Sequence, residues 1–358
     1  MTTSSIIWAD PARAAAFASW LTSVAPQHGL QVDTLRLASA DASFRRYFRI
    51  DAAGGSRIIM DAPPAQEDCQ PFVKVAGLMQ DAGLNAPRVL AWDQPQGFML
   101  LSDLGAQTML DSIAPASAVD AISQPTAGHH ALYMNAVDAL IRWQLASRPD
   151  VLPAYDEALL TRELALFPDW YVAKHRGISL SASQRDTLDK AFAQIKASNL
   201  QSLGDARVYV HRDFMPRNLM LDSQGELGVL DFQDAVYGPI SYDIASLMRD
   251  AFLSWDEEFV LDITVRYWQK ARKAGLPVGD DFGEFYRAVE WMGLQRHLKV
   301  LGIFARLTLR DGKPNYLADT PRFIKYARST CARYRQLGPL MVLLDEIEGN
   351  ETRVGYTF

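Results

Sequence analysis

One stretch near residue 210 constrains the chain more than any other, because it places polar side chains at a fixed spacing along a strand, a loop and a short hairpin. Residues 211–218 read HRDFMPRN, and residues 230–234 read LDFQD. The apolar run at 208–210 predicts a strand before the loop, and a turn at 222–225 separates two further short strands. Asn218 and Asp231 are therefore expected at neighbouring strand ends, an arrangement that a single helix could not provide.

Oxygen-bearing side chains in this order suit the transfer of a phosphoryl group. Such a reaction needs one carboxylate to orient and deprotonate the attacking hydroxyl, and hard oxygen ligands for magnesium on the phosphates. We assign Asp213 as the catalytic base and Asn218 and Asp231 as the metal ligands. His211 is expected to be a structural, hydrogen-bonded residue of the loop, because the triplet HRD alone arises easily by chance. The joint pattern predicts an enzyme that uses ATP as co-substrate and Mg²⁺ as cofactor.

Composition narrows the class of protein and its partners. The chain has 358 residues, 49% hydrophobic and 22% charged, which is enough for a substantial core in two lobes. We find no apolar run of the roughly 18 residues that a membrane helix needs and no basic-plus-apolar leader, so a cytoplasmic protein without a membrane partner is expected. A net charge of −6 offers no broad basic surface for nucleic acid, so we expect a small-molecule partner rather than nucleic acid. We also expect a monomer. Cys69 and Cys331 form neither a disulfide framework nor a zinc pattern and are expected to be reduced thiols.

Local patterns predict a small β-rich lobe followed by a larger, mainly helical one. A helix is expected within 6–30, with an apolar face formed by Ile7, Phe17, Trp20 and Leu21. The strands and helix expected after it are a hairpin of 44–50 and 57–60 around the turn 52–55, a helix at 71–82, and a strand at 97–101. We therefore expect a nucleotide-binding N-terminal lobe at 1–101, a hinge linker at 102–105, and a catalytic and substrate lobe at 106–358.

The order of these parts resembles the aminoglycoside phosphotransferase and choline kinase superfamily. The resemblance rests on the connector LSDLG at 101–105, the loop HRDFMPRNLM, LDFQD, and GPISYD at 238–243. The chain is most similar to the bacterial anomeric amino-sugar kinases of cell-wall recycling, which act on N-acetylmuramate and N-acetylglucosamine. Four segments carry this closer similarity: DASFRRYFR at 41–49, MDAPP at 60–64, FPDWY at 167–171 and QRHLK at 295–299.

The resemblance implies an α+β, protein-kinase-like bilobal fold and an ATP-dependent kinase that forms a sugar 1-phosphate in peptidoglycan recycling. It also implies that the connector holds the adenine of ATP through backbone groups, which makes Leu101, Asp103 and Leu104 nucleotide-binding candidates. Asp243 is expected to be structural, because it matches an N-cap before an apolar helix and its carboxylate could brace the catalytic loop.

One departure from the protein-kinase pattern concerns the cation that grips the nucleotide phosphates. Protein kinases carry a lysine on the third strand, whereas that strand here reads RIIMD at 57–61, and Lys74 falls in a predicted helix. Another cation is therefore needed, or ATP binds weakly. Backbone amides and guanidinium groups at the position of the glycine-rich loop could cradle phosphate. The nucleotide-binding candidates there are Ser43, Phe44, Arg45 and Arg46, with Arg49 close by; on an alternating strand, one set of these arginines could instead be solvated.

Candidates for acceptor binding come from the helical region, and each has an alternative structural explanation. Trp170 and Tyr171 could form a sugar-stacking wall together with Phe167, or could simply pack in the core. Arg296, His297 and Arg306 lie on a predicted long helix at 285–309, where one of them could meet the lactyl carboxylate of N-acetylmuramate or form a solvated face. Glu163 and Asp234 are further candidates for hydrogen bonds to sugar hydroxyls.

Two other functions remain open from the sequence. A kinase for another small acceptor, such as an aminoglycoside, a choline-like alcohol or homoserine, would keep the same catalytic residues. The sequence offers no dense acidic run in the candidate substrate regions, which disfavours a polycationic acceptor. A non-catalytic nucleotide-binding sensor is suggested by the missing third-strand lysine, but such a protein has no chemical reason to keep Asp213, Asn218 and Asp231 together.

Overall fold

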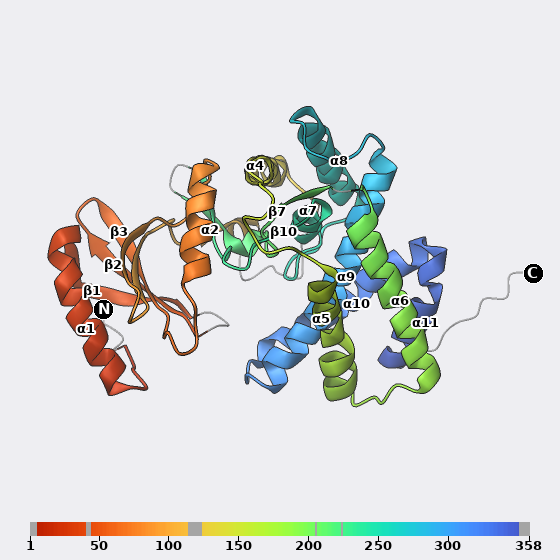
Figure 1. Cartoon of the computed structure of the whole chain (residues 1–358), viewed down its shortest axis with the longest axis horizontal. Helices are drawn as coiled ribbons and strands as arrows, with labels where there is room; N and C mark the ends of the chain where they lie inside the picture. Colours follow the sequence, from red (N-terminus) through yellow and green to blue (C-terminus); the bar gives the residue numbers. More distant parts are fainter. Residues whose placement is uncertain (1–5, 41–43, 114–123, 205, 223–224, 351–358) are drawn as a thin grey trace, which may run out of the picture. The chain divides into compact units, whose positions relative to one another are not determined.

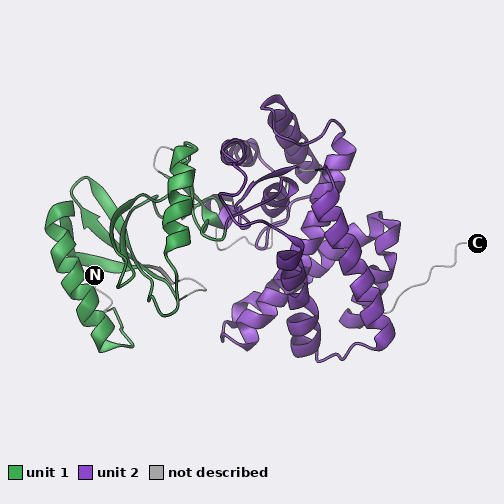
Figure 2. Ribbon diagram, in the orientation of Figure 1, with its two compact units in different colours: residues 1–109, 218–234 green, residues 110–217, 235–358 purple. Residues whose placement is uncertain are grey.

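The computed structural model describes residues 6–40, 44–113, 124–204, 206–222 and 225–350, and these fall into two compact units. Unit 1 consists of residues 1–109 and 218–234, and unit 2 of residues 110–217 and 235–358 (Figure 2). The chain therefore passes from unit 2 into unit 1 directly after the predicted catalytic loop and returns 17 residues later. The predicted division into a nucleotide-binding lobe at 1–101, a linker at 102–105 and a catalytic lobe at 106–358 remains a prediction. The two units are defined by contacts within the chain and not by the function of each part.

Unit 1 is built on a five-stranded antiparallel sheet with the order β1-β2-β3-β5-β4. Its strands are β1 (Leu30–Ala40), β2 (Arg46–Ala52), β3 (Gly55–Asp61), β4 (Val89–Asp93) and β5 (Phe98–Ser102). The predicted hairpin is confirmed, since Ala52 pairs with Gly55 across a turn in which Gly54 and Gly55 both have positive φ. Such a turn suits glycine and matches the twist of the two strands.

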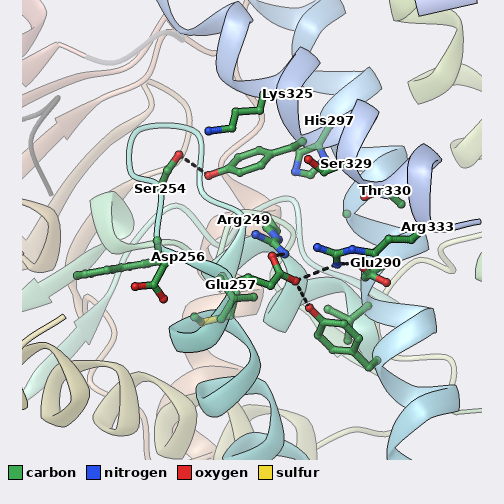
Figure 3. Close-up of a pocket in the computed structure, with 17 residues that line it drawn as sticks. Arg249, Ser254, Asp256, Glu257, Glu290, His297, Lys325, Ser329, Thr330 and Arg333 are labelled. Carbon is green, nitrogen blue, oxygen red and sulfur yellow. Dashed lines mark hydrogen bonds and ion pairs between the residues drawn. The ribbon is translucent and has the colours of Figure 1, made fainter. Parts of the chain in front are cut away.

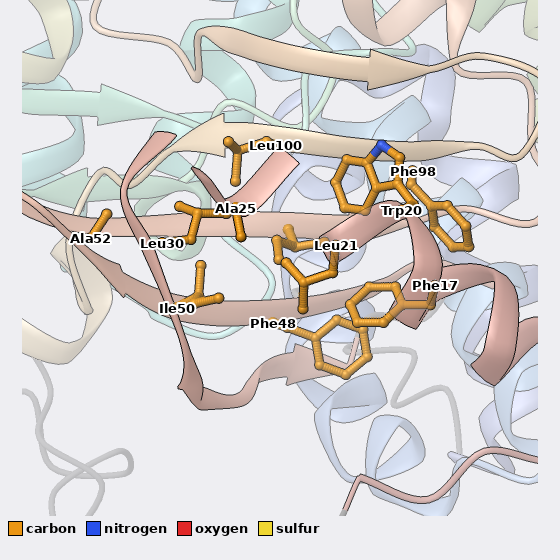
Figure 4. Packing of buried hydrophobic residues seen from close by; sticks show 11 residues of the cluster. Phe17, Trp20, Leu21, Ala25, Leu30, Phe48, Ile50, Ala52, Phe98 and Leu100 are labelled. Carbon is orange, nitrogen blue, oxygen red and sulfur yellow. The ribbon is translucent and has the colours of Figure 1, made fainter. Parts of the chain in front are cut away.

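Helix α1 (Pro11–His28) covers one face of this sheet, and their contact forms the core of unit 1 (Figure 4). The helix begins after Asp10, whose carboxylate accepts a hydrogen bond from Ala12 N, and it ends at Gly29 in the left-handed conformation. The prediction for its apolar face is confirmed for three residues and wrong for Ile7. That side chain precedes the helix and is 85% exposed. The buried residues of this core are Phe17, Trp20, Leu21, Ala25, Leu30, Phe48, Ile50, Ala52, Ile59, Phe98 and Leu100.

Helix α2 (Gln70–Asp81) lies on the side of the sheet away from α1 (Figure 1) and agrees with the predicted helix at 71–82 to within one residue at each end. A second sheet of unit 1 joins strands that are distant in sequence: β6 (Gln107–Thr108), β8 (Leu219–Leu221) and β9 (Leu227–Val229) in the order β6-β8-β9. The ring of Phe72 on α2 packs against Phe232, 5.0 Å between centroids, so α2 also supports the segment that follows β9. Lys74 is exposed on α2.

Unit 2 is mainly helical. Its one sheet among the described residues pairs β7 (Arg207–Val210) with β10 (Val236–Pro239) in antiparallel register. The short helix α3 (Met109–Ile113) marks its start. The other helices are α4 (Ala127–Leu145), α5 (Glu157–Leu166), the π-helix η1 (Phe167–His175), α6 (Ala182–Gln201), α7 (Ser241–Met248), α8 (Glu257–Lys273), α9 (Phe282–Leu309), α10 (Thr320–Arg333) and α11 (Gly338–Glu348). Three 3₁₀ turns complete the helical segments: η2 (Pro216–Asn218), η3 (Pro314–Asp319) and η4 (Arg335–Leu337).

The long helix α9 runs through the middle of unit 2, with α5, α6, α7 and α10 around it (Figure 1). It extends the predicted helix at 285–309 by one turn at its N-terminal end, where the Asp281 carboxylate accepts hydrogen bonds from Gly283 N and Glu284 N. Gly302 lets α9 approach the junction of α5 and η1, because a Cβ atom there would lie 2.3 Å from the backbone of Leu166. No helix among the described residues is long and apolar enough to cross a membrane.

Candidate functional site

The predicted catalytic loop leaves β7 at Val210, and its first residues are fixed by a buried carboxylate. The side chain of Asp243 on α7 accepts hydrogen bonds from His211 N at 2.7 Å and from Arg212 N at 3.0 Å. His211 is itself fully buried, and its Nδ1 accepts a hydrogen bond from Asp213 N at 3.2 Å. The loop is therefore bound through its backbone on both sides of Arg212, directly before the predicted base.

Asp243 differs in one respect from the sequence prediction. It lies in the first turn of α7 rather than at its N-cap, which is Ile240. A carboxylate in that turn is still favourably placed with respect to the helix dipole. Burial raises the pKa of Asp243 to about 7, although the N–H groups of His211 and Arg212 favour the charged form.

Asp213 is only partly buried and faces a cation on α9. The guanidinium Nη2 of Arg296 lies 4.0 Å from Asp213 Oδ1. Arg296 is almost completely buried, its guanidinium lies over the ring of Tyr242, and its Nε makes no hydrogen bond within the described part of the chain. Of the three candidate cations on α9, Arg296 is the one that the structure brings next to the predicted base.

The two predicted metal ligands meet in unit 1. Asn218 lies directly before β8, and Asp231 follows β9 by two residues, as expected for residues at neighbouring strand ends. Asn218 Nδ2 lies 3.4 Å from Asp231 Oδ2, and Leu230 N donates to Asn218 O at 2.9 Å. Asp231 has φ +63, a conformation that costs a non-glycine residue roughly 1–3 kcal/mol and often marks a functional position. An amide oxygen and a carboxylate are ligands that suit magnesium, which is commonly bound by one or two carboxylates together with phosphates.

The arginines predicted to bind phosphate all have acidic partners within unit 1. Arg45 pairs with Glu67 at 3.1 Å, and Glu67 also accepts a hydrogen bond from the exposed Phe44 through its N–H group. Arg46 pairs with the fully buried Asp61 at 2.5 Å and lies over the ring of Trp8. Ser43 lies outside the described residues. Asp61 is the side chain that ends the strand on which protein kinases carry their lysine, and Arg13 of α1 also binds it, at 2.6 Å.

The predicted hinge shows a similar internal pairing. Asp103 binds Arg49 at 2.6 Å, and it accepts further hydrogen bonds from Ser56 Oγ and Gly105 N. These donors lower the pKa of Asp103 against the opposing effect of burial. Leu101 and Leu104 are buried, and Leu101 pairs with Ile58 in the sheet. The connector is thus held to the first sheet by an Arg49–Asp103 ion pair.

The aromatic candidates for acceptor binding lie in the π-helix η1. Tyr171 is buried, stacks on Phe167 and donates its hydroxyl to Glu348 of α11 at 2.8 Å, which fits the core-packing alternative. Trp170 is partly exposed, with Lys174 near its ring. The other two polar candidates lie on other elements: Asp234 is exposed after β9 in unit 1, and Arg306 is partly buried near the C-terminal end of α9.

Glu163 on α5 is buried and engaged by four side chains. One carboxylate oxygen contacts Arg212 and Lys299, and the other accepts hydrogen bonds from Tyr155 and Gln295. Burial raises its pKa, but Lys299 and Arg212 outweigh that effect and lower it to about 2. Lys299, Gln295 and Tyr155 were not identified from the sequence. The available signal was the position of Gln295 and Lys299, which lie one turn apart on an otherwise apolar face of α9 and so indicate a buried polar partner.

A cavity of about 240 Å³ lies elsewhere in unit 2, between α8, α9 and α10 (Figure 3). Glu257, Glu290 and Arg333 form a connected group of ion pairs at its wall, and Arg249 also binds Glu257. Among the predicted site residues that the structure describes, His297 alone lines it; its ring stacks on Tyr326, and burial lowers its pKa well below the usual range. Asp213 is not among the lining residues.

Comparisons with known proteins identify the family of the chain. Residues 34–280 match the family model described as phosphotransferase enzyme family. A relative from Neisseria meningitidis is 48% identical over 95% of this chain and 98% of its own length, and one from Pseudomonas aeruginosa is 52% identical over 86% of each chain. Both are described as N-acetylmuramate/N-acetylglucosamine kinase, and a more distant relative with that description, from Caulobacter vibrioides, is 30% identical over 87% of this chain.

Solved structures share the fold at low sequence identity. A protein from Ralstonia eutropha described as an aminoglycoside phosphotransferase superimposes with a TM-score of 0.61 at 14% identity, covering 93% of this chain and 98% of its own. A choline kinase from Streptococcus pneumoniae gives a TM-score of 0.60 at 12% identity, covering 88% and 99%. The predicted α+β, protein-kinase-like fold is thereby confirmed. The chain belongs to the phosphotransferase enzyme family and is a kinase.

Proposed function

We propose that this protein transfers the γ-phosphoryl group of ATP to the anomeric hydroxyl of N-acetylmuramate or N-acetylglucosamine, in the recycling of peptidoglycan. The product would be the sugar 1-phosphate. The observation that carries the proposal is the similarity, close to half of all residues, to curated kinases of these two sugars along nearly the whole chain. A sugar of this kind is a small soluble acceptor, in keeping with a cytoplasmic enzyme.

Asp213 is proposed as the base of this reaction. Its carboxylate would orient the anomeric hydroxyl for in-line attack. It would accept the hydroxyl proton late in the reaction, because in a loose phosphoryl transition state the bond to the attacking oxygen is only slightly formed. The backbone anchoring of His211 and Arg212 by Asp243 supports this role, because a base must be held in place to act on a bound substrate.

Asn218 and Asp231 are proposed as the ligands of magnesium. The adjacent strand ends hold the two side chains close together, with Asn218 Nδ2 3.4 Å from Asp231 Oδ2, and Gln233 Nε2 orients Asp231 through a hydrogen bond to Oδ1 at 2.9 Å. When bound, magnesium would neutralise charge on the transferred phosphate. The nucleotide itself is proposed to contact the connector through Leu101, Asp103 and Leu104, and the turn before β2 through Ser43, Phe44, Arg45 and Arg46.

The acceptor is proposed to bind unit 2 near Arg296. Arg296 lies beside Asp213 and its Nε lacks a partner among the described residues, so its guanidinium is suited to the lactyl carboxylate that N-acetylmuramate carries and N-acetylglucosamine lacks. Trp170, Tyr171, His297, Arg306, Glu163 and Asp234 were the other candidates. Among these, the partly exposed Trp170 keeps an aromatic surface that suits a pyranose, whereas Tyr171 and Glu163 are buried and bonded within the protein.

The test is magnesium-dependent ATP consumption with four separate acceptors, N-acetylmuramate, N-acetylglucosamine, an aminoglycoside and choline, with phosphorus NMR of the product. A sugar 1-phosphate supports the proposal. Turnover with only the aminoglycoside or choline would refute the amino-sugar assignment while keeping the kinase chemistry.

The role of Asp213 is tested by Asp213→Asn. The variant is expected to fold and to bind ATP, and to lose on the order of a hundredfold or more in kcat, as for the loss of one acid–base group. Full activity of this variant would remove Asp213 from the role of base.

A further inference from the structure

The buried carboxylate of Glu163 links the catalytic loop to the helices behind it. Arg212 Nη2 lies 2.5 Å from Glu163 Oε1, and Lys299 Nζ lies 2.9 Å from the same oxygen. Tyr155 OH and Gln295 Nε2 each donate to Oε2 at 2.7 Å. The cluster thus joins α5, α9, the loop before α5, and the residue that precedes Asp213.

Arg212 has an unusual backbone. Its φ of +78 lies in the left-handed region that a residue with a long side chain seldom adopts. Such a conformation persists only where surrounding contacts enforce it. Two anchors do so here: Asp243 accepts a hydrogen bond from Arg212 N at 3.0 Å, and Glu163 binds the guanidinium.

Charge balance alone does not explain the second anchor. Lys299 is already buried beside Glu163 and would neutralise it, so the carboxylate has no need of a second cation. The guanidinium of Arg212 is partly exposed and also interacts with the charge of Asp213, so its ion pair with Glu163 is not needed to balance charge, but it does tie the loop to α5. The purpose that the contacts indicate is to fix the loop.

We propose that Glu163 is a positioning residue: by binding the guanidinium of Arg212 it holds this residue in its left-handed conformation and so aims Asp213 at the acceptor. This rests on the proposed role of Asp213 as base. Gln295 and Lys299 flank Arg296 on α9, so the same cluster also fixes the helix segment that faces Asp213.

The test is a double-mutant cycle with Glu163→Gln and Arg212→Gly, read as kcat and KM at saturating magnesium. Glycine adopts positive φ freely, so Arg212→Gly removes the tether without straining the backbone and provides a folded variant even where Glu163→Gln is hard to obtain. Each single change is expected to lower kcat by on the order of tenfold to a hundredfold, as for a displaced catalytic group, with little change in KM for ATP. The double variant is expected to be no slower than the slower single variant, because both changes break one link.

A matched control is Glu290→Gln. Glu290 is also buried on α9 and also binds an arginine and a tyrosine hydroxyl, Arg333 and Tyr334, but it does not contact the loop. This variant is expected to be less stable and to keep the kcat of the unaltered protein. The inference would be overturned if the losses in kcat of the two single variants multiplied in the double variant, or if the control lost as much kcat as they do. In either case, an unaltered protein that is active would leave the proposed function standing. No phosphoryl transfer by the unaltered protein to any acceptor would overturn both.

Discussion

Replacing Asp243 should release the predicted catalytic loop, and the structure allows the loss in the free energy of unfolding to be worked out. Asp243→Ala leaves two N–H groups without their acceptor, that of the buried His211 and that of the partly buried Arg212. A buried donor left unsatisfied costs about 1–3 kcal/mol and a partly buried one less, so the free energy of unfolding should fall by about 2–4 kcal/mol. Urea unfolding measures this loss. Hydrogen exchange at the amides of His211 and Arg212 should also become faster, by about tenfold for each 1.4 kcal/mol of lost stability.

A suitable control is Asp281→Ala, because Asp281 also accepts two backbone hydrogen bonds but is exposed at the start of α9. Its loss should cost only about 1 kcal/mol, as for other helix caps, and should leave kcat unchanged. Equal destabilisation by the two substitutions would refute the reasoning, since burial is what distinguishes them.

The pH dependence of the Asp243 variants provides an independent check. Burial raises the pKa of Asp243 from 3.8 to about 7, so the folded protein holds this proton more tightly than the unfolded chain. Its contribution to stability is therefore present below pH 3.8 and is lost as the pH rises through 7. Asp243→Asn cannot titrate there, and its deficit in stability relative to the unaltered protein should shrink between pH 5 and pH 8. A deficit that stays constant over this range would contradict the assignment.

Three further predictions concern other parts of the molecule. Asp231→Ala should abolish magnesium-dependent nucleotide binding in calorimetry, and unchanged binding would exclude it as a metal ligand. Gly302→Ala should destabilise unit 2 by at least about 1–3 kcal/mol in urea unfolding, because the new methyl group would overlap the backbone of Leu166; an unchanged midpoint would show that α9 can shift. The pKa of Glu163 is lowered from 4.5 to about 2 by Lys299 and Arg212 against the effect of burial, so its contribution to stability should be lost as the pH falls from 4.5 to 2, and Glu163→Gln should be less sensitive to acid in that window.

The sequence predicted the fold well where local patterns determine structure. The hairpin of β2 and β3, helix α2 and the hairpin that ends at Asp231 follow from turn residues and alternating apolar positions, and their observed bounds lie within a few residues of the predicted ones. The prediction for Ile7 was wrong because the sequence does not show whether an apolar residue just before a helix faces the core or the solvent.

The contacts around the candidate site were less predictable. Pairing of Glu163 with Arg212 joins residues 49 positions apart, and pairing of Arg49 with Asp103 spans 54. Nothing in the local sequence tells whether a charged residue faces solvent, a substrate or another buried charge, since that depends on which helices pack together. The π-helical winding of η1 was likewise not predicted, because its aromatic residues fit an ordinary helix equally well.

The excursion of residues 218–234 into unit 1 has a consequence for how the protein is made. Strand β6 at Gln107–Thr108 pairs with β8, which the ribosome adds more than a hundred residues later. Unit 1 therefore cannot be completed during synthesis when its first 109 residues emerge, and must wait until Asp234 has been added, by which time α4, α5 and α6 of unit 2 are already available to fold. A fragment that ends at residue 109 would lack β8, the partner strand of β6, and with it β9, so unit 1 is not a separable module of the chain.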